Sequence, residues 1–267
     1  MTENPNSKKI FWILRIAAAG CFIGHGAFGL LKKPAWLAYY AVFHISPEGA
    51  DKLYTVIGMM DIFFAILVLL HPCRAALLWM TFWGIFTSFL RPLAGEGFWE
   101  FFERAGNFGA PLALLAFGGW FDSSVGWFSK MKERPIPEAV ADQLALVLKY
   151  STGLLLIGHG GFGAFMHKEM LFGHFASVGI HLTNPALTLV GWFEIAMGLA
   201  VMIRPLGGLL IFIVVWKIAT ELLYPLSGAP IWEFIERFGS YGVPLALFFT
   251  KALRDALRQA PISKQFQ

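Results

Sequence analysis

Two histidines lie deep inside apolar stretches, each within nearly the same seven-residue sequence. His25 stands in IGHGAFG at residues 23–29, and His159 stands in IGHGGFG at residues 157–163. An acidic residue follows each of them in the next apolar stretch, Asp61 in the first case and Glu194 in the second. Ionisable side chains inside a membrane span are costly and are functional by default. Because an imidazole beside a carboxylate is suited to proton transfer, we predict a catalytic pair in each half of the chain.

Further polar residues are expected at a similar membrane depth. In segment 98–107 four of them are spaced i, i+3, i+4, i+7, which a helix places on one face, and residues 233–240 repeat the spacing. Such a stripe either lies in the lipid headgroups or turns inward and covers a pocket over His25 and Asp61. The residues predicted to bind a substrate are Arg91, Glu100, Glu103, Arg104, Asn107, Thr220, Tyr224, Glu233, Glu236 and Arg237.

The composition places these residues in an all-α integral membrane protein. The chain has 267 residues, of which 57% are hydrophobic and 14% are charged, and its mean hydropathy is +0.62. These values exclude an ordinary soluble domain. A helix of about 20 apolar residues crosses a bilayer. The sequence predicts eight such transmembrane helices, at residues 10–31, 53–70, 75–91, 106–121, 144–165, 186–203, 206–224 and 239–252.

The two halves of the chain are similar to each other beyond the histidine motif. The sequence WEFFER at residues 99–104 corresponds to WEFIER at 232–237, and PLAL occurs at both 111–114 and 244–247. Four spans per copy is an even number, so the copies enter the membrane in the same orientation, related by a pseudo-two-fold axis along the membrane normal. We therefore expect a first four-helix repeat at 1–121, a cytoplasmic linker at 122–142 and a second repeat with a cytoplasmic tail at 143–267.

The distribution of charge predicts the orientation. Lys and Arg are more numerous on the side of the two termini, which the positive-inside rule assigns to the cytoplasm, and we expect a location in a bacterial inner membrane. The net charge of +4 needs no nucleic-acid partner, because the basic residues lie at helix ends beside an anionic leaflet. The lipid bilayer is thus the expected partner.

A metal site is not predicted. Di-iron bundles use Glu-x-x-His motifs, and this sequence has none. His167, His174 and His181 are seven residues apart, about 10.5 Å along a helix, which is too far for neighbours to share one ion. A haem between His25 and His159 is a weaker alternative than a quinone. The structural alternative is that both histidines only brace helix contacts, with the glycines letting the backbones approach.

A longer pattern in the second half resembles a known family. The sequence IGHG at residues 157–160 is followed by GWFEIAMGL at 191–199 and then by Arg204. This pattern resembles the DoxX/DoxD-like membrane proteins, and the first half resembles them with Asp61 in place of Glu and His71 in place of Arg. The resemblance implies a tandem duplication of a four-helix membrane unit. Some members are linked to quinone-coupled oxidation of thiosulfate or are described as quinol-oxidase subunits, so it also implies a redox role.

Three functions agree with these patterns. The first is a membrane redox protein, a quinone-linked oxidoreductase if it is an enzyme. Each repeat would bind a quinone or a small sulfur compound near the outer leaflet, the histidine would exchange protons, and a redox partner protein would exchange electrons. The second is a non-catalytic membrane subunit or assembly factor. The third is a proton-coupled transporter or carrier. The oligomeric state stays open.

Overall fold

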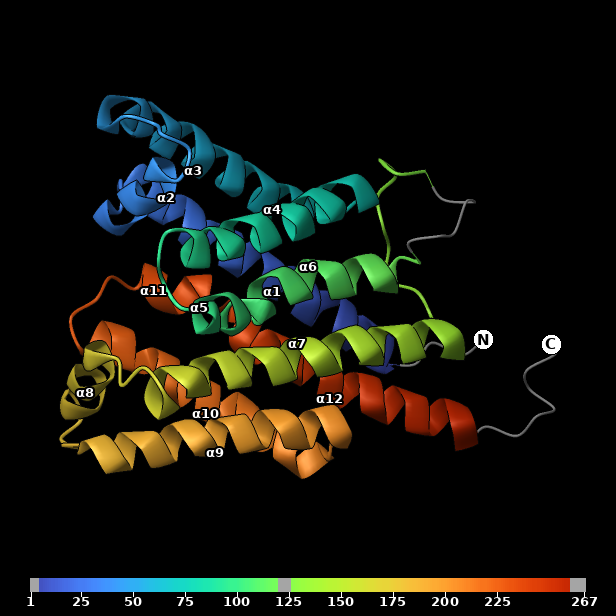
Figure 1. Ribbon diagram of the computed structural model, residues 1–267. Coiled ribbons are helices and arrows are strands. Elements are labelled where there is room, and N and C mark those ends of the chain that lie inside the picture. Colours follow the sequence, from blue (N-terminus) through green and yellow to red (C-terminus); the bar gives the residue numbers. More distant parts are fainter. Residues whose placement is uncertain (1–4, 120–125, 260–267) are drawn as a thin grey trace.

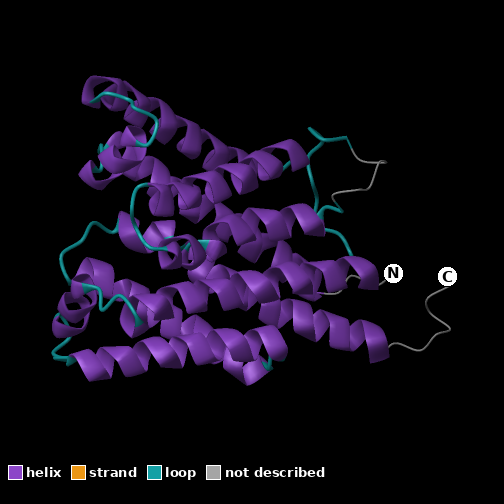
Figure 2. Ribbon diagram, viewed as in Figure 1, coloured by secondary structure: helices purple, strands orange, loops and turns teal. Residues whose placement is uncertain are grey.

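The computed structural model describes residues 5–119 and 126–259, and within these ranges the chain forms helices joined by loops (Figures 1 and 2). The long helices run side by side and form a bundle, in which the start of the first long helix and the end of the last lie at the same end (Figure 1). We call the opposite end the distal end. The eight longer helices are α1 (Pro5–Leu30), α3 (Pro47–Leu70), α4 (Arg74–Leu93), α6 (Ala105–Phe117), α7 (Glu138–Ala164), α9 (Asn184–Ile203), α10 (Gly207–Leu226) and α12 (Phe238–Gln259).

Five short helices lie between the long ones, on the distal side. In the N-terminal half (residues 5–119) they are η1 (Pro34–Trp36), α2 (Leu37–Ala41) and α5 (Phe98–Glu103). In the C-terminal half (residues 126–259) they are α8 (Glu169–Ala176) and α11 (Trp232–Glu236). These short helices cover the places where the predicted polar residues collect.

Five helices are long and apolar enough to cross a membrane: α1, α3, α7, α9 and α10. Each of the eight predicted spans overlaps one long helix, but α6 has only 13 residues, about 20 Å of rise, which is shorter than a bilayer core. It ends at Phe117, before the predicted end at 121. Large apolar side chains are exposed on the candidate spans, as at Leu189 and Ile203. The protein is therefore lipid-embedded.

The predicted linker is partly helical. Helix α7 begins at Glu138, so the last part of segment 122–142 belongs to that helix. Residues 122–125 of the predicted linker and residues 260–267 of the predicted tail lie outside the described ranges. Asp142 and Glu138 bind Arg258, which fastens the start of α7 to the last turns of α12.

Close glycine contacts fix the position of each histidine, along the helix axes, relative to its acidic partner. Gly26 and Gly29 of α1 lie against Gly58 of α3, and any Cβ added there would collide with backbone atoms. In the second half, Gly160 of α7 lies against Gly191 of α9 in the same way. Small residues let helix backbones approach in a membrane, where packing replaces the hydrophobic effect. The glycines of the histidine motif thus fix the crossing of two helices.

The two halves interlock. Helix α5 of the N-terminal half packs on α7, and α11 of the C-terminal half packs on α1. A Cβ added to Gly158 would overlap the backbone nitrogen of Glu103, and one added to Gly24 would overlap that of Glu236. The glycine before each histidine therefore makes room for a short helix from the opposite half.

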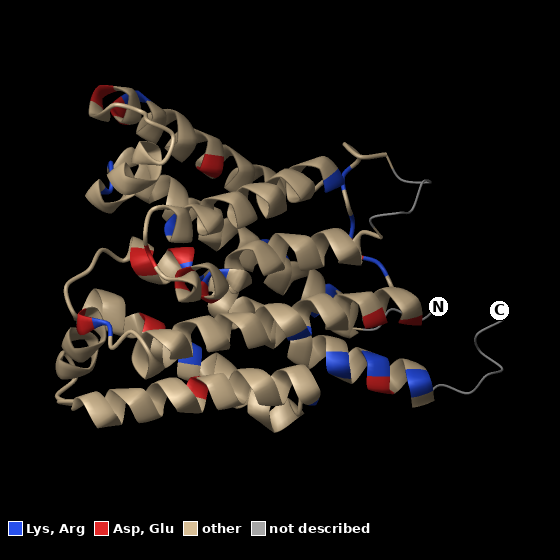
Figure 3. Cartoon of the chain, viewed as in Figure 1, with Lys and Arg blue, Asp and Glu red and all other residues tan. Residues whose placement is uncertain are grey.

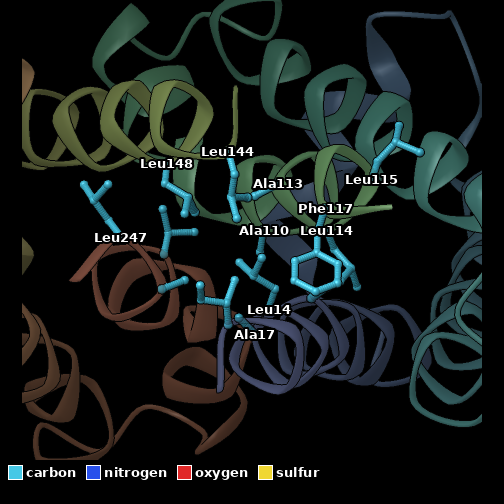
Figure 4. Packing of buried hydrophobic residues seen from close by; sticks show 14 of the residues in the cluster. Leu14, Ala17, Ala110, Ala113, Leu114, Leu115, Phe117, Leu144, Leu148 and Leu247 are labelled. Atoms are coloured by element: carbon cyan, nitrogen blue, oxygen red, sulfur yellow. The ribbon is translucent and has the colours of Figure 1, made fainter. Parts of the chain in front are cut away.

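The main hydrophobic core lies where the two halves of the chain meet. Apolar side chains from α1, α6, α7 and α12 meet there, and Figure 4 shows several of them: Leu14, Ala17, Ala110, Ala113, Leu114, Phe117, Leu144, Leu148 and Leu247. Helices α6 and α12 cross where Gly106 touches Gly239. Because the core is shared, neither half encloses a complete core of its own.

Candidate functional site

The first predicted pair is present. The Nδ1 atom of His25 lies 2.7 Å from Oδ2 of Asp61. Asp61 is fully buried, whereas the His25 side chain is 27% exposed. An ionised carboxylate only accepts hydrogen bonds, so with Asp61 ionised the proton is on Nδ1 and Nε2 is the atom that meets a ligand. This exposure makes His25 the accessible member of the pair.

The second predicted pair is present as well, but it is enclosed. The Nδ1 atom of His159 lies 2.6 Å from Oε2 of Glu194, and both side chains are buried. The indole nitrogen of Trp216 donates a hydrogen bond of 2.7 Å to Oε1 of Glu194. Both carboxylate oxygens of Glu194 therefore have partners.

The first pair lacks this second partner. Trp83 occupies the position in α4 that corresponds to Trp216 in α10, beside Asp61. Within the described residues, Trp83 Nε1 and Asp61 Oδ1 do not reach ordinary hydrogen-bond geometry, although Trp83 lies close enough to act on the Asp61 carboxylate. Both atoms are buried. The carboxylate oxygen that Trp216 binds in the second half is thus held less closely in the first.

A cavity of about 180 Å³ lies beside His25. Aromatic side chains form much of its wall, and the ring of Trp36 lies 4.4 Å from that of His25. Polar groups converge on the same space, as is usual for small-molecule sites. An engineered apolar cavity of about 150 Å³ binds benzene, so this one has room for a single ring. Its lining includes Cys21, Phe22, Trp36, Tyr39, Tyr40, Trp83, Thr87, Ser88, Arg91, Arg104 and Asn107.

The corresponding cavity in the second half is much smaller. It has a volume of about 20 Å³, enough for one water molecule, and is lined by residues that include His159, His174 and Glu194. Helix α8 fills the space, with the His174 ring 4.3 Å from the Tyr224 ring. We expected a pocket in each repeat, but only the first pair faces a cavity of ligand size among the pockets described. The packing of α8 against α10 explains why the second cavity is smaller than the first.

The charged stripes turn inward. Glu103 and Arg104 of the first stripe and Glu236 and Arg237 of the second are at most 6% exposed. The alternative in which these side chains lie in the headgroups is therefore wrong. Figure 3 shows red and blue segments gathered within the bundle around α5, apart from the basic segments at the helix ends on the opposite side.

These charges form a chain of alternating sign across the two halves. Arg104 binds Glu236, and its Nε lies 2.9 Å from Oε2 of Glu103. Arg237 in turn lies 3.6 Å from Glu103 and 3.1 Å from Glu221. Lys217, fully buried in α10, completes the chain at 2.7 Å from Glu221. Six buried charges thus neutralise one another, as buried ions must.

A polar wall closes the distal side of the cavity. Arg91 lies 3.1 Å from Glu96 and 3.3 Å from Glu100, and Lys168 of the second half also binds Glu100. The hydroxyl of Tyr39 donates a hydrogen bond of 2.6 Å to Glu96. Burial raises the pKa of Tyr39 to about 12, so the hydroxyl stays protonated and remains a donor.

The predicted substrate-binding residues fall into three groups. Arg91, Arg104 and Asn107 line the cavity with His25, whereas Thr220 lines the small cavity and Tyr224 lies under Arg237. The others hold ion pairs, including Lys33 with Glu233 at 2.6 Å. These are Glu100, Glu103, Glu233, Glu236 and Arg237.

Sequence reasoning missed the aromatic wall. Trp83 and Trp216 were detectable, because they are separated by the same 133 residues as Asp61 and Glu194. Trp36 and Tyr39 lie in short helices after α1, and nothing in the sequence placed these helices over His25. As for metals, the described residues contain no group of three or more His, Cys, Asp or Glu arranged to hold an ion.

Comparison of the chain with protein-family models, with curated proteins and with solved structures finds no match.

Proposed function

We propose that this chain is a redox-associated membrane protein that binds a quinone-type ring in the cavity beside His25 and exchanges a proton with it. The observation that carries the proposal is the asymmetry of the two pairs. His159 and Glu194 are enclosed, whereas His25 faces a ring-sized aromatic cavity. A flat, partly polar ring matches these aromatic walls and the partly exposed imidazole of His25.

His25 is the residue that meets the ring oxygen. With Nδ1–H bound to Asp61, Nε2 of the neutral imidazole accepts the proton of a quinol, and Nε2–H of the imidazolium donates a hydrogen bond to a quinone oxygen. Asp61 orients the imidazole and stabilises its cation. Reduction of a quinone to a quinol takes two electrons and two protons. In this proposal a separate redox protein exchanges both electrons, His25 transfers one proton, and solvent supplies or takes up the second.

The membrane arrangement belongs to the same proposal. Eight crossings in two parallel repeats are supported by the order of the helices and by the matched His–acid pairs. Both termini are proposed to be cytoplasmic in a bacterial inner membrane, supported by the basic residues near them, as expected for a tandem DoxX-like unit. Single cysteines at Lys8 and at Ser177, labelled from one side of the membrane, test the orientation: only the Ser177→Cys variant is expected to react from outside.

Binding of a short-chain ubiquinone tests the proposed function. His25→Gln removes the ionisable imidazole, and with it the charge-assisted hydrogen bond to the ring, and is expected to weaken binding by about 10- to 100-fold. His159→Gln is the matched control, and it is expected to change the affinity less than threefold because its pair faces no ring-sized cavity. Quenching of the fluorescence of Trp36 and Trp83 provides the measurement.

Two outcomes contradict this function. One is absence of ubiquinone binding to the folded, unmodified protein. The other is equal binding by the His25→Gln and unmodified proteins, which would leave the cavity without a role for the histidine. Thermal unfolding of each variant shows whether a loss of binding merely reflects a loss of fold.

A proton-coupled carrier is the second candidate, and the chain of six buried charges from Lys217 to Glu236 favours it. Buried ion pairs of this kind line proton and ion pathways in membrane proteins. Proteoliposomes loaded with a pH-sensitive dye distinguish the candidates. Substrate-dependent proton flux without quinone supports the carrier.

A further inference from the structure

The cavity beside His25 reaches the surface between α3 and α4. Leu53 and Ile57 of α3 form one side of its outer wall, and Phe86 of α4 forms the other. All three side chains are only partly buried. At the rim, the half-exposed ring of Phe43 lies 6.1 Å from that of Phe86. We call this opening the α3–α4 portal, with Phe43, Leu53, Ile57 and Phe86 as its residues.

The surroundings of the portal are apolar. On α3, Val56 and Met59 are 57% and 55% exposed, and on α4, Phe82 is 53% exposed. Figure 1 shows α3 at the edge of the bundle; α3 packs closely against α1 but only loosely against α4, and its outward apolar side chains are exposed. Since α3 is one of the five candidate spans, these side chains face acyl chains and the portal opens into lipid.

The distal side offers no comparable exit. There the wall consists of the Arg91 ion pairs with Glu96 and Glu100 and of the hydrogen bond from Tyr39. An apolar chain that left on this side would have to separate these ion pairs, including that of Arg91 with the buried Glu100, without replacing them, which is costly. A cavity of about 180 Å³ is also close to the size needed for one ring alone. A longer ligand must therefore extend through an opening, and the apolar opening is the portal.

We infer that the ligand is an amphiphile with a single ring and an apolar tail, whose tail leaves the cavity through the α3–α4 portal into the bilayer. This inference rests on the proposed function and names the ligand class: a lipid quinone or quinol with one six-membered ring, which enters from the membrane. The ring lies between Trp36, His25 and Arg91, and the tail passes between Phe43 and Phe86.

Photolabelling tests the path of the tail. The probe is a one-ring ubiquinone analogue with a decyl chain that carries a diazirine at its end, added to the purified protein in lipid nanodiscs. Mass spectrometry is expected to find the label on residues 47–70 and 74–93. An excess of tail-less ubiquinone, which competes for the ring site alone, is expected to remove most of it. Label on the distal loop at 94–97, or label that the tail-less quinone does not reduce, overturns the inference.

A substitution in the portal distinguishes binding of the apolar tail from binding of the ring. Ile57→Trp narrows the gap between α3 and α4 and is expected to weaken binding of decylubiquinone at least fivefold more than it weakens binding of tail-less ubiquinone. Ile66→Trp, the same change at an exposed site further along α3, is the control and is expected to leave both affinities unchanged. Equal binding of decylubiquinone to the Ile57→Trp and unmodified proteins contradicts the portal.

The two proposals fail separately. If tail-less ubiquinone binds and depends on His25 but the tail is found elsewhere, the ring site stands and the portal is wrong. If tail-less ubiquinone does not bind the unmodified protein, the proposed function is wrong, and the portal then has no ring site to serve.

Discussion

Changing Arg104 to glutamine is expected to lower the free energy of unfolding by about 3–5 kcal/mol, the usual cost of removing one partner from a buried ion pair. Arg104 binds Glu236 from the other half and also Glu103, and all three side chains are buried. The change leaves Glu236 without its closest cation. Chemical unfolding of the purified protein in detergent, followed by circular dichroism, measures the loss.

Two further variants make this prediction specific. The double variant Arg104→Gln with Glu236→Gln removes both charges and is expected to recover most of the loss, because a neutral pair leaves no unpaired ion. Arg254→Gln breaks a partly exposed pair with Asp142 and is expected to cost less than about 1 kcal/mol. If the losses from Arg104→Gln and Arg254→Gln are equal, the buried chain of charges does not stabilise the junction.

The second large effect is expected at Gly158. Replacement by alanine places a methyl group on the backbone of Glu103, where no side-chain rotation relieves the overlap. Overpacking of a core costs about 1–3 kcal/mol, and a clash with backbone belongs at the upper end or beyond. We expect a loss of about 3 kcal/mol or more, together with separation of α5 from α7, measured as faster proteolysis of the α5 segment.

Gly208→Ala is the matched control. Gly208 also lies in a helix, but nothing lies within 4 Å of a Cβ built there. Alanine is favoured over glycine in a helix by about 0.5–1 kcal/mol, so this variant is expected to be as stable as the unmodified protein or slightly more stable. A Gly158→Ala protein that matches Gly208→Ala in stability would show that α5 does not depend on this contact.

The sequence was sufficient to predict the two pairs, for a physical reason. A bilayer restricts the chain to helices, and the cost of buried ionisable groups makes His25, Asp61, His159 and Glu194 stand out. The similarity between the two halves of the sequence then matches His25 with His159 and Asp61 with Glu194. The inward direction of the charged stripes was one of two predicted arrangements, and burial of Glu103 and Arg104 decides between them.

The exchange of short helices between the halves could not be predicted. Spacing shows that Glu103 and Arg104 share a face, but it does not show which helix that face meets. In the structure Arg104 reaches the cavity of its own half, whereas the backbone of Glu103 packs on Gly158 of the other half. Such contacts between distant parts of the chain leave no local pattern.

The unequal size of the two cavities was also beyond the sequence. The substitution of Tyr224 for Arg91 is visible in the alignment of the halves, but the volume depends on where the loop helices pack. Helix α8 places His174 against Tyr224, while η1 and α2 leave space beside Trp36.

The interlocking of α5 with α7 and of α11 with α1 has a consequence for biogenesis. While the ribosome is still synthesising the C-terminal half, the inserted N-terminal half has no partner for the α1 surface around Gly24, and Arg104 lacks Glu236. The contact of α11 with α1 can therefore form only after residues 232–236 have been synthesised. Two separately expressed halves would need each other to complete this contact.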